Sequence, residues 1–177
     1  MTIEEHYHAI APKLTNYLVA SGSPYAIACE IVQETFLRVW KRRDELLDDP
    51  AQVSGLVYTI ARNLRNDYAR RAKREVLQDE IRDGDGGAGE SLVAEGATGG
   101  YENRPGEADE ETRRLRTRLD AALAQVPPLL REAFLLFQIS ELSIREIACQ
   151  TGASESLVKV RIHRAKEKLR EILKDCL

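Results

Sequence analysis

The sequence predicts an all-α protein made of two small helical domains joined by a flexible acidic linker. Three observations support this fold class: apolar residues recur at helical spacing, aromatic residues make up only 6% of the chain, and charged residues are strongly segregated along it. A chain of 177 residues is long enough for one domain or for two small ones. The distribution of charge decides between these two organisations.

The charge distribution divides the chain between residues 75 and 111. This stretch carries twelve acidic and two basic residues, a net charge of −10, whereas the whole chain has a net charge of −3. It also contains two glycine-rich runs and almost no periodic apolar residues, so it cannot bury enough surface to offset the entropy lost on ordering. We therefore predict domains at 1–75 and 112–177 and a linker at 76–111. A long surface loop inside one domain is the alternative, although structureless loops of this length are uncommon.

The first domain is expected to begin with two helices. Thr2 and Glu5 have the spacing of a capping box, which predicts the start of the first helix. Ser23 is a favourable N-cap residue and Pro24 suits a first helical turn, so a second helix should run from there to about Arg43.

The second predicted helix has an apolar face and a polar face. The polar face contains Leu37, and its polar neighbours include Glu30, Gln33 and Glu34. A single exposed leucine on a polar face is ordinary. It can equally be the apolar centre of a surface that binds a partner, and the periodicity alone leaves both interpretations open.

A third helix should run from about Ser54 to Arg74, with an apolar stripe on one side. The opposite face is basic and rich in amides but has no acidic residue; it comprises Thr59, Arg62, Asn63, Asn66, Arg70 and Lys73. Solvated faces usually mix both signs of charge. A face of one sign therefore indicates contact with phosphates, with asparagines available to hydrogen bond to bases or sugars. A purely structural face is an equally supported alternative at this point.

The second domain should begin with two helices separated by Pro127 and Pro128. Apolar residues at helical spacing between 115 and 126 mark the first of them. The apolar run at 129–137 marks the second, because proline ends one helix and is accepted in the first turn of the next.

Residues 142–154 contain the most specific local pattern in the chain. Ser143 and Glu146 have the spacing of a capping box, Gly152 permits a left-handed turn, and Ser154 can cap the following helix. A short helix, a tight turn and a second helix in this order form a helix-turn-helix.

The final helix has an apolar back and a polar front. The back comprises Val158, Ile162, Ala165, Leu169 and Ile172. The candidate DNA contacts on the front and its margins are Ser156, Lys159, Val160, Arg161, His163 and Arg164. In such a helix the front reaches base edges and basic margins meet phosphates; Arg164 could pair with guanine and Val160 could touch a thymine methyl group. A helix-turn-helix can also serve packing alone, but the basic front favours DNA binding.

Other classes of function find little support in the sequence. The three cysteines, Cys29, Cys149 and Cys176, are widely separated and form no CxxC pair, so we expect no disulfide or zinc site and interpret them as small buried residues. The acidic residues are densest in the segment predicted as the linker, so we expect no catalytic residue, metal or other cofactor. No apolar run is long enough to cross a membrane and no signal peptide is recognisable, which predicts a cytoplasmic protein without membrane insertion.

The order of these patterns resembles the sigma-70 family in its minimal, extracytoplasmic-function group. Residues 30–40 are similar to the helix of conserved region two that binds the clamp helices of the largest RNA polymerase subunit, which implies that Glu30, Gln33, Glu34 and Leu37 bind polymerase. Residues 56–71 resemble the segment that recognises and melts the minus-ten promoter element. The DNA contacts that this resemblance implies are Arg62, Asn63, Asn66, Arg70 and Arg71, with Asn63 at or near the pocket for a flipped base.

The second domain, from Leu123 to Leu169, resembles region four of the same family. That region docks on the polymerase flap and reads the minus-thirty-five element, here through Lys159, Val160, His163 and Arg164.

The resemblance implies a transcription initiation factor without enzymatic activity. Its partners would be core RNA polymerase, promoter DNA and an anti-sigma factor that covers the polymerase-binding surfaces. The alternative is a stand-alone helix-turn-helix repressor, which would bind duplex DNA tightly without polymerase and would leave the asparagine and arginine face of the third helix unexplained. A nucleic-acid-processing enzyme would need clustered carboxylates or a metal site within a folded domain.

Overall fold

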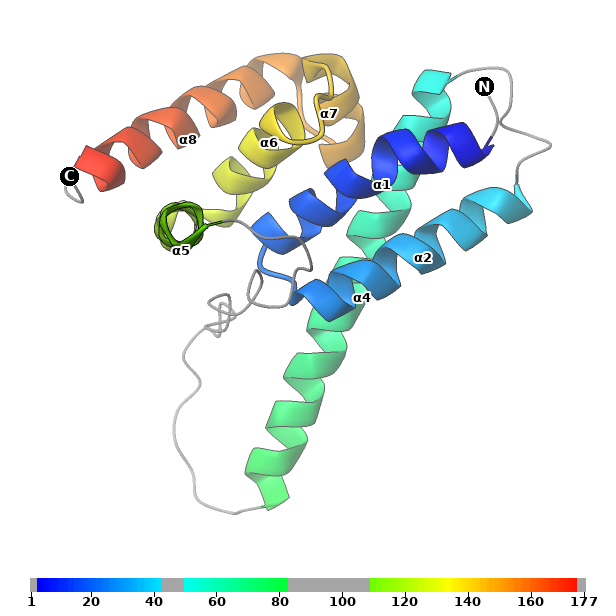
Figure 1. Cartoon of the computed structure of the whole chain (residues 1–177), viewed down its shortest axis with the longest axis horizontal. Helices are drawn as coiled ribbons and strands as arrows, with labels where there is room; N and C mark the ends of the chain where they lie inside the picture. Colours follow the sequence, from blue (N-terminus) through cyan, green and yellow to red (C-terminus); the bar gives the residue numbers. More distant parts are fainter. Residues whose placement is uncertain (1–2, 43–49, 83–108, 175–177) are drawn as a thin grey trace.

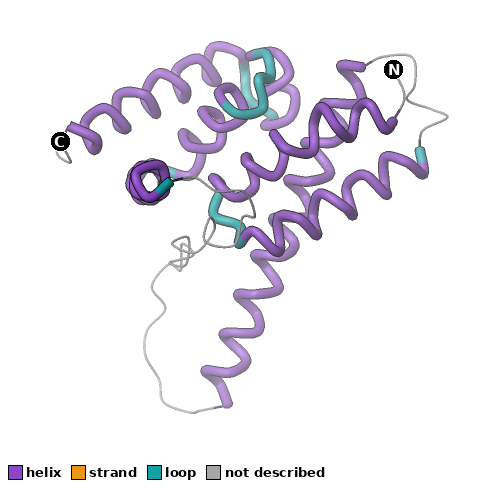
Figure 2. Tube along the Cα trace, viewed as in Figure 1, coloured by secondary structure: helices purple, strands orange, loops and turns teal. Residues whose placement is uncertain are grey.

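The computed structural model describes residues 3–42, 50–82 and 109–174, and within these ranges every regular element is an α-helix (Figures 1 and 2). The helices are α1 (Ile3–Ala20), α2 (Tyr25–Lys41), α4 (Pro50–Arg82), α5 (Glu110–Gln125), α6 (Pro128–Gln138), α7 (Ile144–Thr151) and α8 (Glu155–Lys174). The predicted all-α fold class is confirmed. Thr2 and Cys176 lie outside the described residues.

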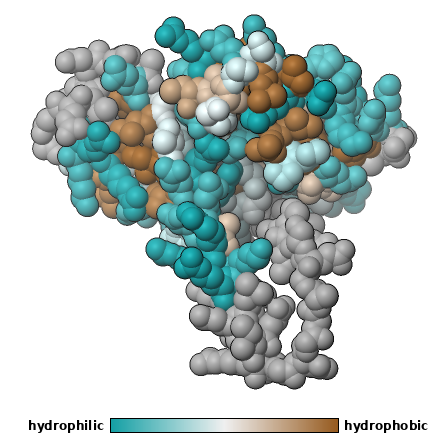
Figure 3. All heavy atoms as spheres, turned by 180° about the vertical axis from the view of Figure 1, so that it is seen from behind, coloured by the Kyte–Doolittle hydropathy of each residue, from teal (hydrophilic) through white to brown (hydrophobic). Residues whose placement is uncertain are grey.

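Helices α1, α2 and α4 pack together around the apolar stripes that the sequence predicts. Figure 1 shows α1 and α2 side by side across the N-terminal half of α4, whose C-terminal half projects away from the other helices. Leu14, Leu18, Ile31, Val57 and Ala61 form the centre of this packing and are fully buried. Where the projecting part of α4 is coloured in Figure 3, its surface is hydrophilic.

The turn between α1 and α2 differs from the prediction. Ser23 is not the N-cap of α2; Pro24 takes that position and makes no side-chain capping bond. Gly22 has a φ of 97°, its N–H donates to the carbonyl of Val19, and the Ser23 N–H donates to the carbonyl of Leu18. This is the Schellman arrangement that closes a helix with a left-handed glycine. Ser23 therefore belongs to the end of α1, because the glycine before it fixes the turn.

The limits of the linker also need correction. Helix α4 starts at Pro50, where proline is favourable in a first turn, and continues to Arg82, so residues 76–82 are helical. No glycine or proline interrupts the chain between Gly55 and Gly84. Helix α5 is capped by Asp109, whose carboxylate accepts a hydrogen bond of 3.0 Å from the backbone N–H of Thr112. Residues 83–108 of the predicted linker lie outside the described residues.

The helix-turn-helix of the second half is confirmed. The N–H of Ser143 donates to Glu146 at 2.7 Å, and the N–H of Glu146 donates to the Ser143 hydroxyl at 3.3 Å, which completes the capping box of α7. Gly152 ends α7 with a φ of 64°. The Ser154 hydroxyl then accepts a hydrogen bond of 3.2 Å from Leu157, at the start of α8.

The two halves of the chain pack against each other. Helices α6 and α7 lie next to α1 and the N-terminal part of α4 (Figure 1). Between the halves, Tyr17 of α1 and Tyr58 of α4 are almost completely buried, and their rings meet edge to face with centroids 5.8 Å apart. The N-terminal part of α4 is therefore covered by the second half of the chain.

Candidate functional site

Helix α8 presents the predicted front of the helix-turn-helix to solvent. Its back is held against the domain by Val158 and Ala165, which are fully buried. On the front and margins, Ser156, Lys159, Val160, His163 and Arg164 are exposed and Arg161 is partly exposed. The structure therefore brings the six predicted residues together on the accessible side of one rigidly packed helix.

Leu157 is a member of this surface that sequence reasoning missed. Its side chain is 43% exposed, close to the 44% of Val160, and the two residues stand three positions apart on α8. Side chains at this spacing are neighbours on a helix surface. The sequence did contain a signal for its exposure, because Leu157 lies outside the apolar stripe of this helix, which begins at Val158. A leucine at the start of an amphipathic helix is nevertheless easily assigned to the buried side of that helix.

Two side chains of α8 are engaged by neighbours. His163 Nδ1 lies 3.3 Å from a carboxylate oxygen of Glu167, one turn further along the helix. Lys166 lies over the ring of Phe137, with its Nζ 5.5 Å from the ring centroid. Lys166 is therefore turned toward its own domain, which leaves Lys159, Arg161 and Arg164 as the predicted cations of the front.

The predicted DNA face of α4 is divided by the structure. Asn63, Asn66, Arg70 and Arg71 are exposed on the part of the helix that is open to solvent. Arg70 forms an ion pair with Asp67 on the same helix. Arg62 does not share the open surface, because its guanidinium group is bound by residues of the second half of the chain.

Arg62 and Arg65 converge on one carboxylate of α6. The Nε of Arg62 donates to Glu132 Oε1 at 2.8 Å, and a terminal nitrogen of Arg65 donates to the same oxygen at 3.3 Å. Arg62 also donates to the backbone carbonyl of Gln150 at 2.5 Å, and Arg65 donates to the hydroxyl of Tyr17 at 3.2 Å. Arg65 was not among the predicted site residues, although it is one turn from Arg62.

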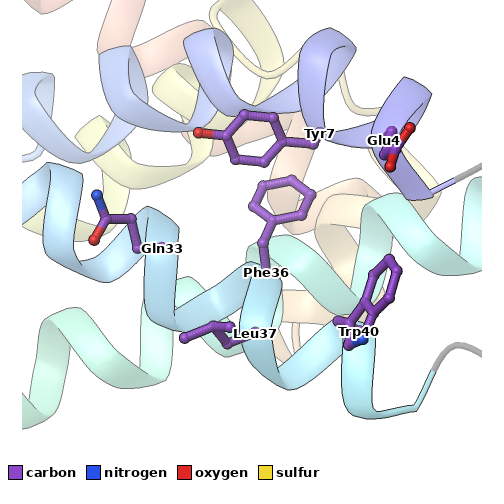
Figure 4. A pocket seen from close by; sticks show the side chains of 6 residues that line it. All are labelled: Glu4, Tyr7, Gln33, Phe36, Leu37 and Trp40. Carbon is purple, nitrogen blue, oxygen red and sulfur yellow. The ribbon is translucent and has the colours of Figure 1, made fainter.

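The predicted polymerase surface on α2 lies beside an apolar groove that runs between α1 and α2. The groove has a volume of about 430 Å³, and its lining residues are Glu4, Tyr7, Gln33, Phe36, Leu37 and Trp40 (Figure 4). Leu37 is 56% exposed and Trp40 is 47% exposed. Tyr7 packs edge to face on Phe36, with ring centroids 4.9 Å apart. Leu37 is therefore part of a larger apolar surface, which includes Tyr7 and Trp40 that sequence reasoning missed.

The acidic members of the predicted polymerase surface are engaged within the chain. Glu34 accepts a hydrogen bond of 2.7 Å from Arg38, one turn away. Glu30 accepts a hydrogen bond of 3.2 Å from the hydroxyl of Tyr68 on α4, and this bond raises the pKa of Tyr68. Gln33 and Leu37 line the groove, whereas Glu30 and Glu34 are not among its lining residues.

The structure corrects the prediction for two cysteines and adds one perturbed carboxylate. Cys149 is exposed on α7 and Cys29 is partly exposed, so neither is the fully buried residue that was expected. Cys149 lies on the outward side of α7, two residues after Ile147, whose side chain occupies the core. Burial raises the pKa of Asp120 on α5 to about 6, against a weaker opposing effect of Arg116.

Two further findings concern only the described residues. These ranges contain no group of three or more histidine, cysteine, aspartate or glutamate side chains arranged to hold a metal ion. Among the helices described, none combines the length and apolar character that crossing a membrane requires.

The chain matches two protein-family models in the order of its two halves. Sigma-70 region 2 matches residues 6–75, and Sigma-70, region 4 matches residues 116–169. The two matched segments contain most of the α1–α2 groove, the predicted DNA face of α4 and the helix-turn-helix. They leave most of the acidic segment between the halves unmatched.

Curated relatives align along nearly the whole chain. The ferric citrate uptake sigma factor FecI of Escherichia coli is 32% identical, over 94% of this chain and 88% of the relative. The RNA polymerase sigma factor CarQ of Myxococcus xanthus is 31% identical, over 96% and 88%. The ECF RNA polymerase sigma factor RpoE of Cereibacter sphaeroides is 28% identical, over 94% and 83%.

Two solved structures share the fold. One is the sigma factor RpoE in complex with the anti-sigma factor NepR from Bartonella quintana, with a TM-score of 0.65, 24% identity and coverage of 97% of this chain and 96% of that one. The other is CnrH in complex with the cytosolic domain of CnrY, with a TM-score of 0.65, 21% identity and coverage of 98% and 88%.

Proposed function

Because this chain belongs to the sigma-70 family and to its extracytoplasmic-function group, we propose that it initiates transcription through three surfaces. The groove between α1 and α2 binds core RNA polymerase, the open face of α4 binds the minus-ten element, and the front of α8 reads the minus-thirty-five element. The surface of α8 gives the strongest support to the proposal. It combines a buried apolar back with an exposed front, as a helix that enters the major groove requires.

The minus-thirty-five element is read from the N-terminal two thirds of α8. Arg164 pairs with a guanine, and Val160 contacts a thymine methyl group. Lys159 and Arg161 bind phosphates at the margins, and Ser156 and His163 complete the contact surface. The capping bonds at Ser143 and Ser154 support this assignment, because they fix the turn that orients α8.

The minus-ten element is bound on the open face of α4. Asn63 lies at the pocket for an unpaired base, while Asn66, Arg70 and Arg71 bind the nearby strand. Their exposure supports this role. A base that is stacked and paired in duplex DNA cannot enter a protein pocket, so this contact requires melted DNA. Arg62 can join this surface only after its bonds to Glu132 and Gln150 are broken.

The polymerase contact is centred on Leu37 and Gln33. These residues line an apolar groove whose other exposed members, Tyr7 and Trp40, can bury large side chains of a partner, as the centres of protein interfaces commonly do. The partner element is the pair of clamp helices of the largest polymerase subunit. The second contact, with the polymerase flap, is made by region four.

An anti-sigma factor is a further proposed partner. One of the similar solved structures is a sigma factor in complex with the anti-sigma factor NepR. The exposed apolar groove between α1 and α2 is a surface that such a regulator can cover in competition with polymerase. The chain itself is proposed to act in the cytoplasm as a protein without catalytic activity or cofactor.

A stand-alone helix-turn-helix repressor is not favoured. The match to region 2 over residues 6–75 includes the α1–α2 groove and the face of α4, which a repressor of that kind does not need.

Run-off transcription with purified core polymerase tests the proposal. A library of promoter fragments is transcribed with the wild-type chain, with a combined Asn63→Ala and Arg164→Ala variant, and without the chain. Start sites that require the chain and are lost with the variant support the proposal. Tight binding of one duplex sequence by the chain alone, without any dependent start site, would instead support the repressor.

A further inference from the structure

A small cavity lies between the turn after α1, the middle of α4 and the first turns of α6. Its volume is about 180 Å³, and its polar lining residues are Ser21, Arg65, Arg131 and Glu132. Pockets that hold drug-sized ligands have volumes of about 300 to 1,000 Å³. This cavity therefore has room for a small ion or for one chemical group of a larger molecule.

The charged groups at this cavity do not balance. Oε1 of Glu132 accepts hydrogen bonds from Arg62 at 2.8 Å and from Arg65 at 3.3 Å. Among the residues that the structure describes, no carboxylate forms an ion pair with Arg131, whose guanidinium group donates one hydrogen bond, of 3.4 Å, to the backbone carbonyl of Leu123. Three guanidinium groups thus have one carboxylate between them, which leaves an excess of two positive charges.

This excess charge is partly withdrawn from water. The side chains of Arg65 and Glu132 are 20% and 13% exposed, and Arg131 is partly buried. Burial lowers the pKa of Arg131, and the nearby charge of Arg65 lowers it as well. Charges removed from water are normally compensated by a partner of opposite sign. A bound anion would supply that compensation, because it lies in the field of both arginines.

Arg65 is held in position by the chain itself. One of its terminal nitrogens donates to the hydroxyl of Tyr17 at 3.2 Å, and its guanidinium carbon lies 5.7 Å from the centroid of the Tyr17 ring, which is fully buried. A group that is fixed in advance loses less conformational entropy when a ligand binds. Guanidinium groups also bind phosphate oxygens through a planar set of donors, often two at a time.

We propose that this cavity is a binding site for a small phosphate anion, whose oxygens accept hydrogen bonds from Arg65 and Arg131. A phosphate group has several oxygens, so it can bind both guanidinium groups at once. Its charge of about −1.5 to −2 at neutral pH matches the excess positive charge at the cavity. The ligand is inorganic phosphate or the phosphate group of a small metabolite, and the site is separate from the surfaces assigned to polymerase and promoter DNA.

Thermal unfolding of the full chain with inorganic phosphate tests the proposal, with sodium chloride at equal ionic strength as the reference. Arg131→Gln removes one charge from the cavity. Leu129→Glu adds a carboxylate at a lining residue that is 58% exposed, so the variant should still fold. The matched controls are Arg170→Gln, at an exposed arginine of α8, and Leu115→Glu, at a leucine that is also 58% exposed but does not line the cavity. Circular dichroism verifies that each variant retains the helical content of the wild type.

Phosphate at roughly ten times its Kd should raise the Tm of the wild type and of both controls by about 3 to 6 °C relative to chloride. The Tm of Arg131→Gln and of Leu129→Glu should not respond. In calorimetric titration with inorganic phosphate, Arg131→Gln should weaken the affinity by at least about tenfold, because charge-assisted hydrogen bonds are lost. Equal responses in all five chains, or a wild-type Tm that is the same in phosphate and in chloride, would overturn the proposal.

Titration with glycerol 3-phosphate distinguishes the two sources of the phosphate group. Binding of this ester as tightly as inorganic phosphate supports a phosphorylated metabolite as the ligand, whereas binding of inorganic phosphate alone supports the free anion. In both cases Leu129→Glu should abolish binding, and an affinity that this variant leaves unchanged would contradict the site. None of these measurements includes polymerase or promoter DNA, so their outcome is independent of the proposed function.

Discussion

Arg62 of α4 donates a hydrogen bond of 2.8 Å to Glu132 of α6, although the two residues lie on different halves of the chain. The sequence places Arg62 on a basic face that was interpreted as a DNA surface. In the structure Arg62 lies at the edge of that face, and its guanidinium group contacts Glu132 of α6. The same side chain can therefore take part in domain closure and in promoter binding, but not in both at once.

Arg164→Ala should weaken recognition of the minus-thirty-five element. An arginine that pairs with guanine contributes about 1 to 3 kcal/mol of discrimination, so transcription from promoters with the preferred element should fall by roughly 5- to 150-fold at limiting concentrations of the chain. Run-off transcription on promoters that differ only in this element measures the effect. Arg170→Ala is the matched control, because Arg170 is exposed on the same helix but beyond the predicted front. An equal loss with both variants would contradict the assignment.

Leu37→Ala should weaken binding to core polymerase without unfolding the chain. A leucine at the centre of an apolar interface contributes more than about 1 kcal/mol, which corresponds to at least roughly fivefold in affinity. Because the side chain is 56% exposed, the free energy of unfolding should change by no more than about 0.5 kcal/mol. Binding assays with immobilised core polymerase and urea unfolding measure the two effects.

Ile31→Ala provides the contrast on the same helix. Ile31 is fully buried, so its truncation should lower the free energy of unfolding by about 2 to 5 kcal/mol. If Leu37→Ala destabilised the chain to a similar extent, or bound polymerase like the wild type, Leu37 would not be the centre of the polymerase surface.

Gly152→Ala should destabilise the chain, and Gly55→Ala should not. Neither glycine has atoms within 4 Å of an added Cβ, so crowding does not separate the two variants. Gly152 has a φ of 64°, where an L-residue costs about 1 kcal/mol, whereas Gly55 lies inside α4, where alanine gains roughly 0.5 to 1 kcal/mol. Thermal unfolding of both variants checks the opposite signs. A stabilised Gly152→Ala variant would contradict the left-handed turn.

Asp120→Asn should stabilise the chain at neutral pH. Burial raises the pKa of Asp120 to about 6 from an ordinary value of 3.8, so its ionised form is less favourable in the folded chain than in the unfolded chain. The wild type therefore loses stability as the pH rises from about 4 to about 6, and the variant avoids this loss. We expect a gain of about 1 kcal/mol at pH 7. Urea unfolding at pH 4 and pH 7 measures it, and an equal gain at both pH values would contradict a titrating Asp120.

The helix-turn-helix was predictable because its signals are local. A capping box at Ser143 and Glu146, a left-handed glycine at Gly152 and a cap at Ser154 act over a few residues, and the structure contains all of them. The same local logic went wrong at Ser23. At that position the preceding Gly22 ends α1, and the Ser23 N–H donates to a carbonyl of α1. Ser23 is therefore not the N-cap of α2, although serine is a favourable N-cap residue.

The features that the sequence did not predict depend on contacts between distant segments. Nothing in the residues around Arg62 indicates that Glu132 would bind it, because the pairing depends on how the halves pack. The groove beside Leu37 requires Tyr7 from α1 as well as Trp40 from α2, and periodicity along one helix cannot show a groove between two. Cys149 was assigned to the core by its residue type, whereas its position on α7 makes it exposed.

Selection of promoters from a randomised library by the chain with core polymerase tests the central claim most directly. The selection is carried out with the wild type, with Asn63→Ala and with Arg164→Ala, and the preferred bases at each position are compared. The account predicts that Asn63→Ala relaxes the preference only in the downstream element and that Arg164→Ala relaxes it only in the upstream element. A library that yields the same two elements with all three chains, or no elements that depend on the chain, would contradict the claim that α4 and α8 read the promoter.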